Sequence, residues 1–131
     1  MIGLDTNVIV RYIVQDDPAQ SAAAARLFDT FTADLSGYVS LVSVVELVWV
    51  LESCYEVGRP EIEALIESLL RSRGLVIEQA ELIWRALQLF SKTNAEFADC
   101  LIERSGQIAG CEYTVTFDRS AAKTAGMQLL S

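Results

Sequence analysis

The stretch MIGLDTNVIVRYIV (residues 1–14) joins two apolar segments through a single acidic residue, Asp5. The segment before Asp5 is too short for a helix and predicts a buried strand over residues 1–5. The segment after it is apolar on nearly all sides and predicts a helix over residues 6–14. Aspartate is favoured at a helix N-terminus, but a carboxylate among apolar neighbours is costly to bury without a partner. The stretch therefore predicts a strand, an acid and a helix in direct succession.

A similar succession recurs twice further along the chain. The segment GYVSL (residues 37–41) leads into a strongly apolar helix over residues 43–55, and YTVTF (residues 113–117) leads into Asp118 and a short helix over residues 120–125. Apolar patterning predicts further strands over residues 75–78 and 127–130 and further helices over residues 19–31, 60–73, 80–91 and 95–109. Short β segments thus alternate with helices along the whole chain.

Signals at two helix ends agree with this alternation. Asp17-Pro18 combines a favoured N-cap with proline at the first helical position, and Gly110 follows the helix predicted over residues 95–109. No Asn-Gly hairpin signal occurs. We therefore predict an α/β fold, a three-layer α/β/α sandwich around a central, mostly parallel sheet of four or five strands. The length suits a single domain over residues 1–131.

Composition excludes several classes of site. The chain has no histidine, which removes Ser-His-Asp and Cys-His mechanisms and histidine-ligated zinc. Three cysteines without metal-like spacing predict reduced thiols in or near the core. No apolar run is long enough to span a bilayer, and the N-terminus lacks the basic start of a signal peptide, so we expect a cytoplasmic protein. Hydrolysis must then use carboxylates, a metal-activated water, or Lys and Tyr.

The formal net charge of −8 argues against loose binding of nucleic acid through a basic surface. A phosphate group can still bind through a metal ion and local basic residues. The nearest basic candidates for phosphate contact are Arg11, Arg119 and Lys123. Hard oxygen ligands favour Mg²⁺ or Mn²⁺.

Four acids stand out as candidates for such a metal site: Asp5, Glu46, Asp99 and Asp118. Ligands bind at the carboxyl ends of parallel strands. Asp5 and Asp118 follow strands, Glu46 begins the helix after the second strand, and Asp99 can join them from a nearby helix. Close carboxylates repel one another unless a cation lies between them. The pattern therefore points to a metal-dependent enzyme with one or two ions.

Each acid also has a structural interpretation. Asp5 and Asp118 can act only as helix N-caps, and Ser43-Val-Val-Glu46 fits a capping box. Glu46 nevertheless lies among apolar residues on its helix, whereas Asp99 shares a polar helix side with other acids. If the acids are only caps, the chain is a non-catalytic protein-interaction module. Trp49 and Trp84 occupy apolar helical stripes and predict core or interface positions.

The chain resembles the PIN-domain ribonucleases and, in size, the VapC-type toxins of toxin–antitoxin pairs. The matching segments are GLDTNVIVRYI at the start, SVVELVWVL in the second apolar helix, EFADCLI in the late helix and VTFDRSAAK near the end. A receiver domain instead needs a pair of acids after its first strand, and a haloacid-dehalogenase-like site needs Asp-x-Asp where this chain has Asp5-Thr6-Asn7. The order and spacing of the four segments favour the PIN-domain resemblance.

The resemblance implies that Asp5, Glu46, Asp99 and Asp118 form an acidic active site that cleaves RNA with Mg²⁺ or Mn²⁺. It implies supporting hydrogen bonds from Thr6, Asn7, Ser43 and Thr116. It also implies a homodimer and a small antitoxin that occupies a groove and approaches the acids. On this basis we expect a metal-dependent endoribonuclease, the toxin of a type II toxin–antitoxin system.

Overall fold

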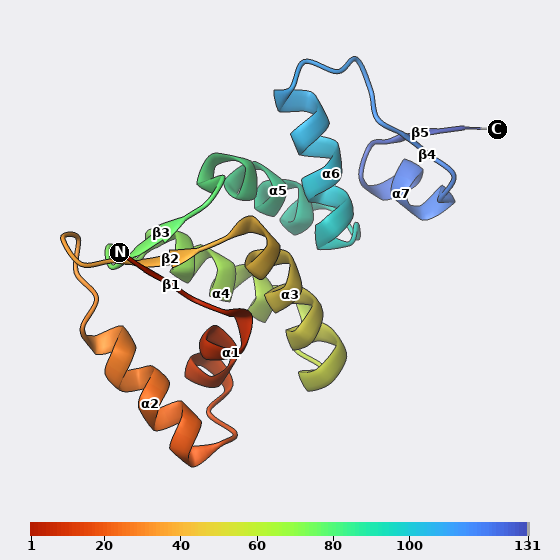
Figure 1. Cartoon of the computed structure of the whole chain (residues 1–131). Coiled ribbons are helices and arrows are strands. Elements are labelled where there is room, and N and C mark those ends of the chain that lie inside the picture. The colour runs from red at the N-terminus through yellow and green to blue at the C-terminus, as the bar shows by residue number, and fades with distance from the viewer. Residues whose placement is uncertain (131) are drawn as a thin grey trace. The chain divides into compact units, whose positions relative to one another are not determined.

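The computed structural model of the chain describes residues 1–130 and divides into two compact units (Figure 1). The first unit comprises Met1–Gly58 and Ser68–Glu78. The second comprises Arg59–Glu67 and the residues from Gln79 onward. Helix α4 (Arg59–Arg71) contributes residues to both units.

The first unit is built on a three-stranded parallel sheet in the order β1-β2-β3. Its strands are β1 (Ile2–Gly3), β2 (Gly37–Val39) and β3 (Leu75–Ile77). The connections between them carry α1 (Thr6–Val14), α2 (Pro18–Asp29), α3 (Leu41–Tyr55) and α4. Helix α1 packs against both α2 and α3, and its Ile9 and Val10 are fully buried. The apolar first stretch of the chain thus supplies both an edge strand and a core helix.

The second unit combines two packed helices with a small sheet. Helices α5 (Ala80–Lys92) and α6 (Phe97–Ile108) lie side by side, and the Phe90 and Phe97 rings meet edge to face at 5.6 Å between centroids. Strands β4 (Val115–Thr116) and β5 (Gln128–Leu129) pair in parallel, and α7 (Arg119–Thr124) connects them. Parallel neighbours need a crossover connection, which α7 supplies.

The α/β class and the parallel pairing of strands are confirmed, but the predicted single sheet of four or five strands is wrong. Within residues 1–130, five strands form one sheet of three and one of two. Each strand is only two or three residues long. Such short segments carry little register information of their own, so sequence patterning locates the strands without specifying which of them join one sheet.

Most predicted elements occur within a few residues of their expected bounds. Asp17 caps α2 by accepting a hydrogen bond from the Gln20 N–H at 3.0 Å, with Pro18 as the next residue. Gly110 follows α6 with a φ of 92°, a left-handed conformation that glycine adopts readily. These helix-end signals were correctly predicted because they act within one turn of the chain.

Predictions about burial are less successful. Cys100 is buried as expected, but Cys54 and Cys111 are exposed, so the interpretation as core thiols holds for one of three. Trp49 is 62% exposed, so of the two positions predicted for it, core or interface, it does not occupy the core. Over residues 1–130, none of the helices combines the length and the apolar character that crossing a bilayer requires.

Candidate acidic site

Asp118 lies where β4 passes into α7. Its Oδ1 accepts hydrogen bonds from the N–H groups of Ser120 at 2.8 Å and Ala121 at 3.3 Å. Its own N–H donates to Oγ1 of Thr116 at 3.0 Å. Aspartate caps a helix through such bonds, and the threonine hydroxyl fixes the backbone just before the cap. The cap leaves the second carboxylate oxygen of Asp118 with no bond to these amides.

Asp99 lies in the first turn of α6, next to the fully buried Cys100. The pKa of the Asp99 carboxyl is raised above its usual value, first by desolvation on partial burial and second by the charge of Asp118. The structure therefore brings Asp99 and Asp118 within electrostatic reach of each other in the second unit. Two carboxylates in this relation disfavour simultaneous ionisation.

Asp5 lies where β1 passes into α1. Its Oδ1 accepts a hydrogen bond from the Thr6 N–H at 2.8 Å, and it is the N-cap of α1. Thr6 is buried, whereas Asn7 is exposed at the start of the helix. Asp5 itself is exposed, so the expectation that its apolar neighbours deprive it of water is wrong. The apolar residues of α1 turn into the core and leave the cap at the surface.

Glu46 lies further inside its helix than predicted. Helix α3 begins at Leu41, and its N-cap is Ser40, whose Oγ accepts from the Ser43 N–H at 3.1 Å. The proposed capping box of Ser43 and Glu46 is therefore wrong. Ser43 is buried, with its Oγ 3.2 Å from Oγ of Ser40, and Glu46 is exposed. The exposed Glu78 accepts a hydrogen bond from the Leu41 N–H at 2.8 Å, at the first residue of α3.

The four acids are divided equally between the two units. Asp5 and Glu46 belong to the first unit, and Asp99 and Asp118 belong to the second. In the part of the chain that the structure describes, no three Asp, Glu or Cys side chains gather closely enough to hold a metal ion. The Asp99–Asp118 pair does have the chemistry of a divalent cation ligand set, because carboxylate oxygens suit Mg²⁺ and a cation relieves their repulsion.

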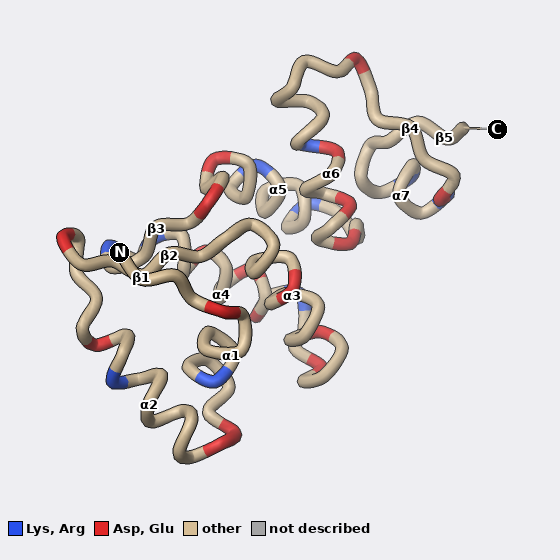
Figure 2. Tube along the Cα trace, in the orientation of Figure 1, with Lys and Arg blue, Asp and Glu red and all other residues tan. Residues whose placement is uncertain are grey.

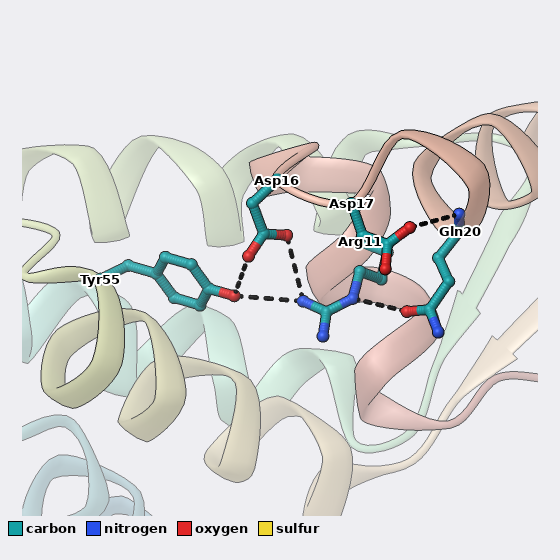
Figure 3. Close-up of polar contacts among 5 residues, drawn as sticks. All are labelled: Arg11, Asp16, Asp17, Gln20 and Tyr55. Carbon is teal, nitrogen blue, oxygen red and sulfur yellow. Dashed lines mark hydrogen bonds and ion pairs between the residues drawn. The ribbon is translucent and has the colours of Figure 1, made fainter.

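The three basic candidates for phosphate contact differ in their exposure and in the hydrogen bonds they already make. Arg119 and Lys123 are exposed on α7, which Asp118 caps. Arg11 is already engaged: its guanidinium donates to Gln20 Oε1 at 2.8 Å and to Asp16 Oδ1 and Tyr55 Oη at 3.1 Å each (Figure 3). Arg119 and Lys123 are therefore the better candidates for a phosphate contact.

The charge along the chain is mostly negative. The sequence contains 18 acidic and 10 basic residues, and Figure 2 shows acidic segments on elements throughout the trace, with fewer basic ones between them. This charge distribution gives no reason to expect that a ligand binds the candidate site through a broad basic surface. Any anionic ligand would have to be held by local groups.

Sequence reasoning missed two arginines that organise the structure. Arg11 was considered only as a phosphate contact, although it joins α1, the α1–α2 connection and the end of α3. Arg59 directly precedes the helix predicted over residues 60–73 and was given no role, yet it donates to three main-chain carbonyls. Neither role has a local sequence signal, because every partner except Asp16 lies nine or more residues away.

Two comparisons with known proteins bear on this site. A family model described as the PIN domain matches residues 2–127. A curated protein from Aquifex aeolicus (strain VF5), described as a VapC ribonuclease, is 26% identical over 125 residues. That alignment covers 92% of this chain and 89% of the relative. The family match extends across the two units and includes all four candidate acids.

Proposed function

The chain belongs to the PIN domain family, and from this premise we propose that it is a metal-dependent endoribonuclease, the toxin of a type II toxin–antitoxin system. The family assignment agrees with the resemblance inferred from sequence. The family match spans both units, which supports treating residues 1–131 as one nuclease domain of the predicted three-layer type. The ribonuclease activity of the Aquifex relative supports RNA as the substrate class.

The four acids are proposed to serve one reaction. Asp5, Asp99 and Asp118 would hold one or two Mg²⁺ or Mn²⁺ ions. When bound, such an ion lowers the pKa of a water molecule and offsets the charge of a phosphodiester. Glu46 would accept a hydrogen bond from the attacking water at a carboxylate oxygen and orient it.

Neighbouring side chains would keep these acids in place. Thr116 fixes the backbone of Asp118 through the bond from the Asp118 N–H to Oγ1. Thr6, Asn7 and Ser43 are proposed to support the site in the first unit. On α7, Arg119 and Lys123 are proposed to contact a substrate phosphate.

One observation carries this proposal. Asp99 is half-buried, and its pKa is raised by desolvation and by the charge of Asp118. Holding a carboxylate in that position opposes folding unless a ligand interacts better with its charged form. A divalent cation does so, whereas a purely structural acid would be better placed in water.

The decisive test separates helix capping from metal chemistry. Asn caps a helix about as well as Asp does, so Asp118→Asn and Asp5→Asn keep the cap and remove the charge. We expect RNA cleavage to fall by more than about 100-fold in each, because even outer-shell partners of metal ligands contribute 10–100-fold. The unfolding midpoint should stay nearly unchanged.

Asp17→Asn is the matched control. Asp17 caps α2 as Asp118 caps α7, but it is not among the proposed site residues, so its variant should cleave RNA at the wild-type rate. If all three variants cleave RNA equally well, the acids are only caps and the chain is the non-catalytic interaction module considered above. Cleavage of total RNA with and without EDTA provides the assay.

A partner protein is proposed by the same reasoning. Toxins of this type are paired with a small antitoxin, and a mostly apolar groove of 350 Å³ lies between α1 and α2. Asn7, Val8, Ala23 and Leu27 contribute to its lining. The homodimer and the cytoplasmic location also remain predictions, and light scattering of the purified chain tests the first of them.

A further inference from the structure

Arg59 makes an unusual set of contacts in the second unit. It is the first residue of α4, after the N-cap Gly58. One guanidinium nitrogen donates to the Ala95 carbonyl at 2.8 Å. Another donates to the carbonyls of Phe90 at 2.6 Å and Thr93 at 2.9 Å. The guanidinium carbon also lies 3.7 Å from the centroid of the Phe90 ring.

The three acceptors belong to one short connection. Phe90 lies in the last turn of α5, Thr93 is the C-cap of that helix, and Ala95 precedes Glu96, the N-cap of α6. The last carbonyls of a helix have no partner within it. The planar fork of arginine can bind several such oxygens at once, which a single ammonium group does less well. Arg59 therefore ties the end of α5 to the start of α6.

The rest of the connection is equally constrained. Thr93 Oγ1 donates to the Leu89 carbonyl at 2.8 Å and accepts from the Ala95 N–H at 3.2 Å. Glu96, the N-cap of α6, makes no side-chain cap. Among the described hydrogen bonds of this connection, the other partners lie within residues 89–96, and Arg59 alone comes from outside that range. Its removal is therefore the change most able to loosen the connection.

The connection leads directly to Asp99. Phe97 begins α6 and meets the Phe90 ring on which the guanidinium lies, and Asp99 follows two residues later. A shift of the α5–α6 connection would move the first turn of α6 and with it the Asp99 carboxylate. The hydrogen bonds of Arg59 go to the carbonyls of this connection and not to either carboxylate. Arg59 therefore acts on the pair through this turn.

We infer that Arg59 is a positioning residue: by holding the carbonyls of Phe90, Thr93 and Ala95, it fixes the first turn of α6 and keeps Asp99 beside Asp118 as a metal-ligand pair. This inference rests on the proposed function. It assigns to Arg59 an effect on metal affinity beyond its effect on stability.

The test compares Arg59→Met with Arg85→Met. Both remove a guanidinium from the second unit and keep an unbranched side chain. In residues 1–130, the ion pair shown for Arg85 is with the exposed Glu81 one turn away on α5. Amide hydrogen exchange over residues 94–101 and Mn²⁺ calorimetry are measured on each folded protein. Charge-assisted hydrogen bonds are worth about tenfold or more in an equilibrium.

For Arg59→Met we expect exchange in residues 94–101 to accelerate by at least about tenfold and Mn²⁺ affinity to fall by about tenfold, as for other outer-shell changes. Saturating Mn²⁺ should restore RNA cleavage in this variant. Arg85→Met should match the wild type in exchange and in affinity. If Arg59→Met unfolds, Arg59→Lys keeps the charge and the stem, and it should show the same changes to a smaller extent.

Two outcomes would overturn the inference, and they can be told apart. If the wild type binds Mn²⁺ but Arg59→Met lowers only the unfolding midpoint, Arg59 is purely structural and the proposed function stands. If the wild type neither binds Mn²⁺ nor cleaves RNA, the proposed function fails. Hydrogen exchange then still reports whether Arg59 holds the α5–α6 connection.

Discussion

Glu46 and Asp99 are both acids on helices, but their surroundings differ sharply. Glu46 is exposed on α3, and its helix neighbours one turn away are the exposed Val42 and Trp49, with 75% and 62% of their surface accessible. Asp99 is half-buried on α6, beside Phe97 and Cys100, which are almost completely covered. Water therefore solvates the charged form of Glu46 much better than that of Asp99.

The difference in burial indicates different roles for Glu46 and Asp99. A desolvated carboxylate next to a second carboxylate gains most from a bound cation, because the cation replaces lost hydration and removes repulsion. An exposed carboxylate gains less from a cation and is better placed to meet water or substrate. We therefore propose that Asp99 holds the metal ion together with Asp118 and Asp5, and that Glu46 orients the water.

The largest predicted effect is on Mn²⁺ affinity and RNA cleavage, and it distinguishes the role of Asp99 from that of Glu46. Asp99→Asn should lower Mn²⁺ affinity by more than about tenfold and remove nearly all RNA cleavage. Glu46→Gln should lower cleavage by about 10²–10⁴-fold, the usual contribution of a positioned acid or base, while Mn²⁺ affinity stays close to that of the wild type. Calorimetry and single-turnover cleavage provide the two measurements.

Glu96→Gln is the control for this pair, because Glu96 is exposed at the start of the same helix as Asp99 and makes no side-chain cap. It should change neither affinity nor rate. Equal losses of Mn²⁺ affinity in Asp99→Asn and Glu46→Gln would contradict the division of duties. They would indicate that both acids hold the ion.

The same two helices each carry a cysteine, which provides a chemical probe of their surroundings. Burial raises the pKa of the Cys100 thiol on α6 to about 11, whereas Cys54 near the end of α3 is exposed. At pH 7 a thiol with that pKa is ionised in only about one molecule in 10⁴, and the thiolate is the reactive form. Iodoacetamide should therefore modify Cys54 at least about 100-fold faster than Cys100.

Mass spectrometry of the digested protein measures the two rates, and unfolding in urea should make them similar. Comparable rates in the native protein would mean that α6 is open to reagent and that the desolvation of Asp99 is not present in solution. A Cys111→Ser background simplifies the measurement, because Cys111 is also exposed.

Sequence predicted the local features of the site well. Capping was one of two interpretations of Asp5 and Asp118, and both accept the amide hydrogen bonds of an N-cap. The residues that decide such caps lie within four positions of one another. Strand positions were also predictable, since short apolar segments between helices have few other interpretations.

Sequence failed where distant residues decide the outcome. A helical projection placed Glu46 among apolar residues and Asp99 on a polar side, but exposure depends on which side of a helix other elements cover. Asp118, a residue from another element, contributes to the raised pKa of Asp99. The roles of Arg11 and Arg59 were missed for the same reason, and the division of five strands into two sheets could not be predicted from strands this short.

Truncating one aromatic side chain on α6 and one on α3 compares the burial of the two helices through the free energy of unfolding. Phe97 at the start of α6 is 2% exposed, and Phe97→Ala should cost about 3–5 kcal/mol of unfolding free energy. Trp49 on α3 is largely exposed, and Trp49→Ala should cost less than about 1 kcal/mol. Urea titration followed by circular dichroism measures both. A loss of several kcal/mol in Trp49→Ala, diminishing on dilution, would reveal that a second copy covers this side of α3.

The smallest predicted effect concerns the C-terminal end of α3, where Tyr55 donates a hydrogen bond to Asp16 at 2.7 Å (Figure 3). This bond is the main cause that lowers the pKa of the Asp16 carboxyl below its ordinary value of 3.8, and the Arg11 charge adds to it. A carboxyl whose pKa is lowered in the folded state stabilises the fold above its unfolded pKa, and this contribution disappears as the pH falls through the folded pKa. Tyr55→Phe should therefore lower the unfolding midpoint at pH 7, and the difference from the wild type should narrow as the pH falls below 3.8.

Tyr113→Phe is the matched control for this last prediction, because it removes a hydroxyl from an exposed tyrosine of the other unit. Its difference from the wild type should be small and independent of pH. If the Tyr55→Phe difference were equally constant with pH, Tyr55 would stabilise α3 through packing alone. The charged network of Arg11 and Asp16 would then have no measurable part in holding that end of the helix, and Arg11 would again be available as a phosphate contact.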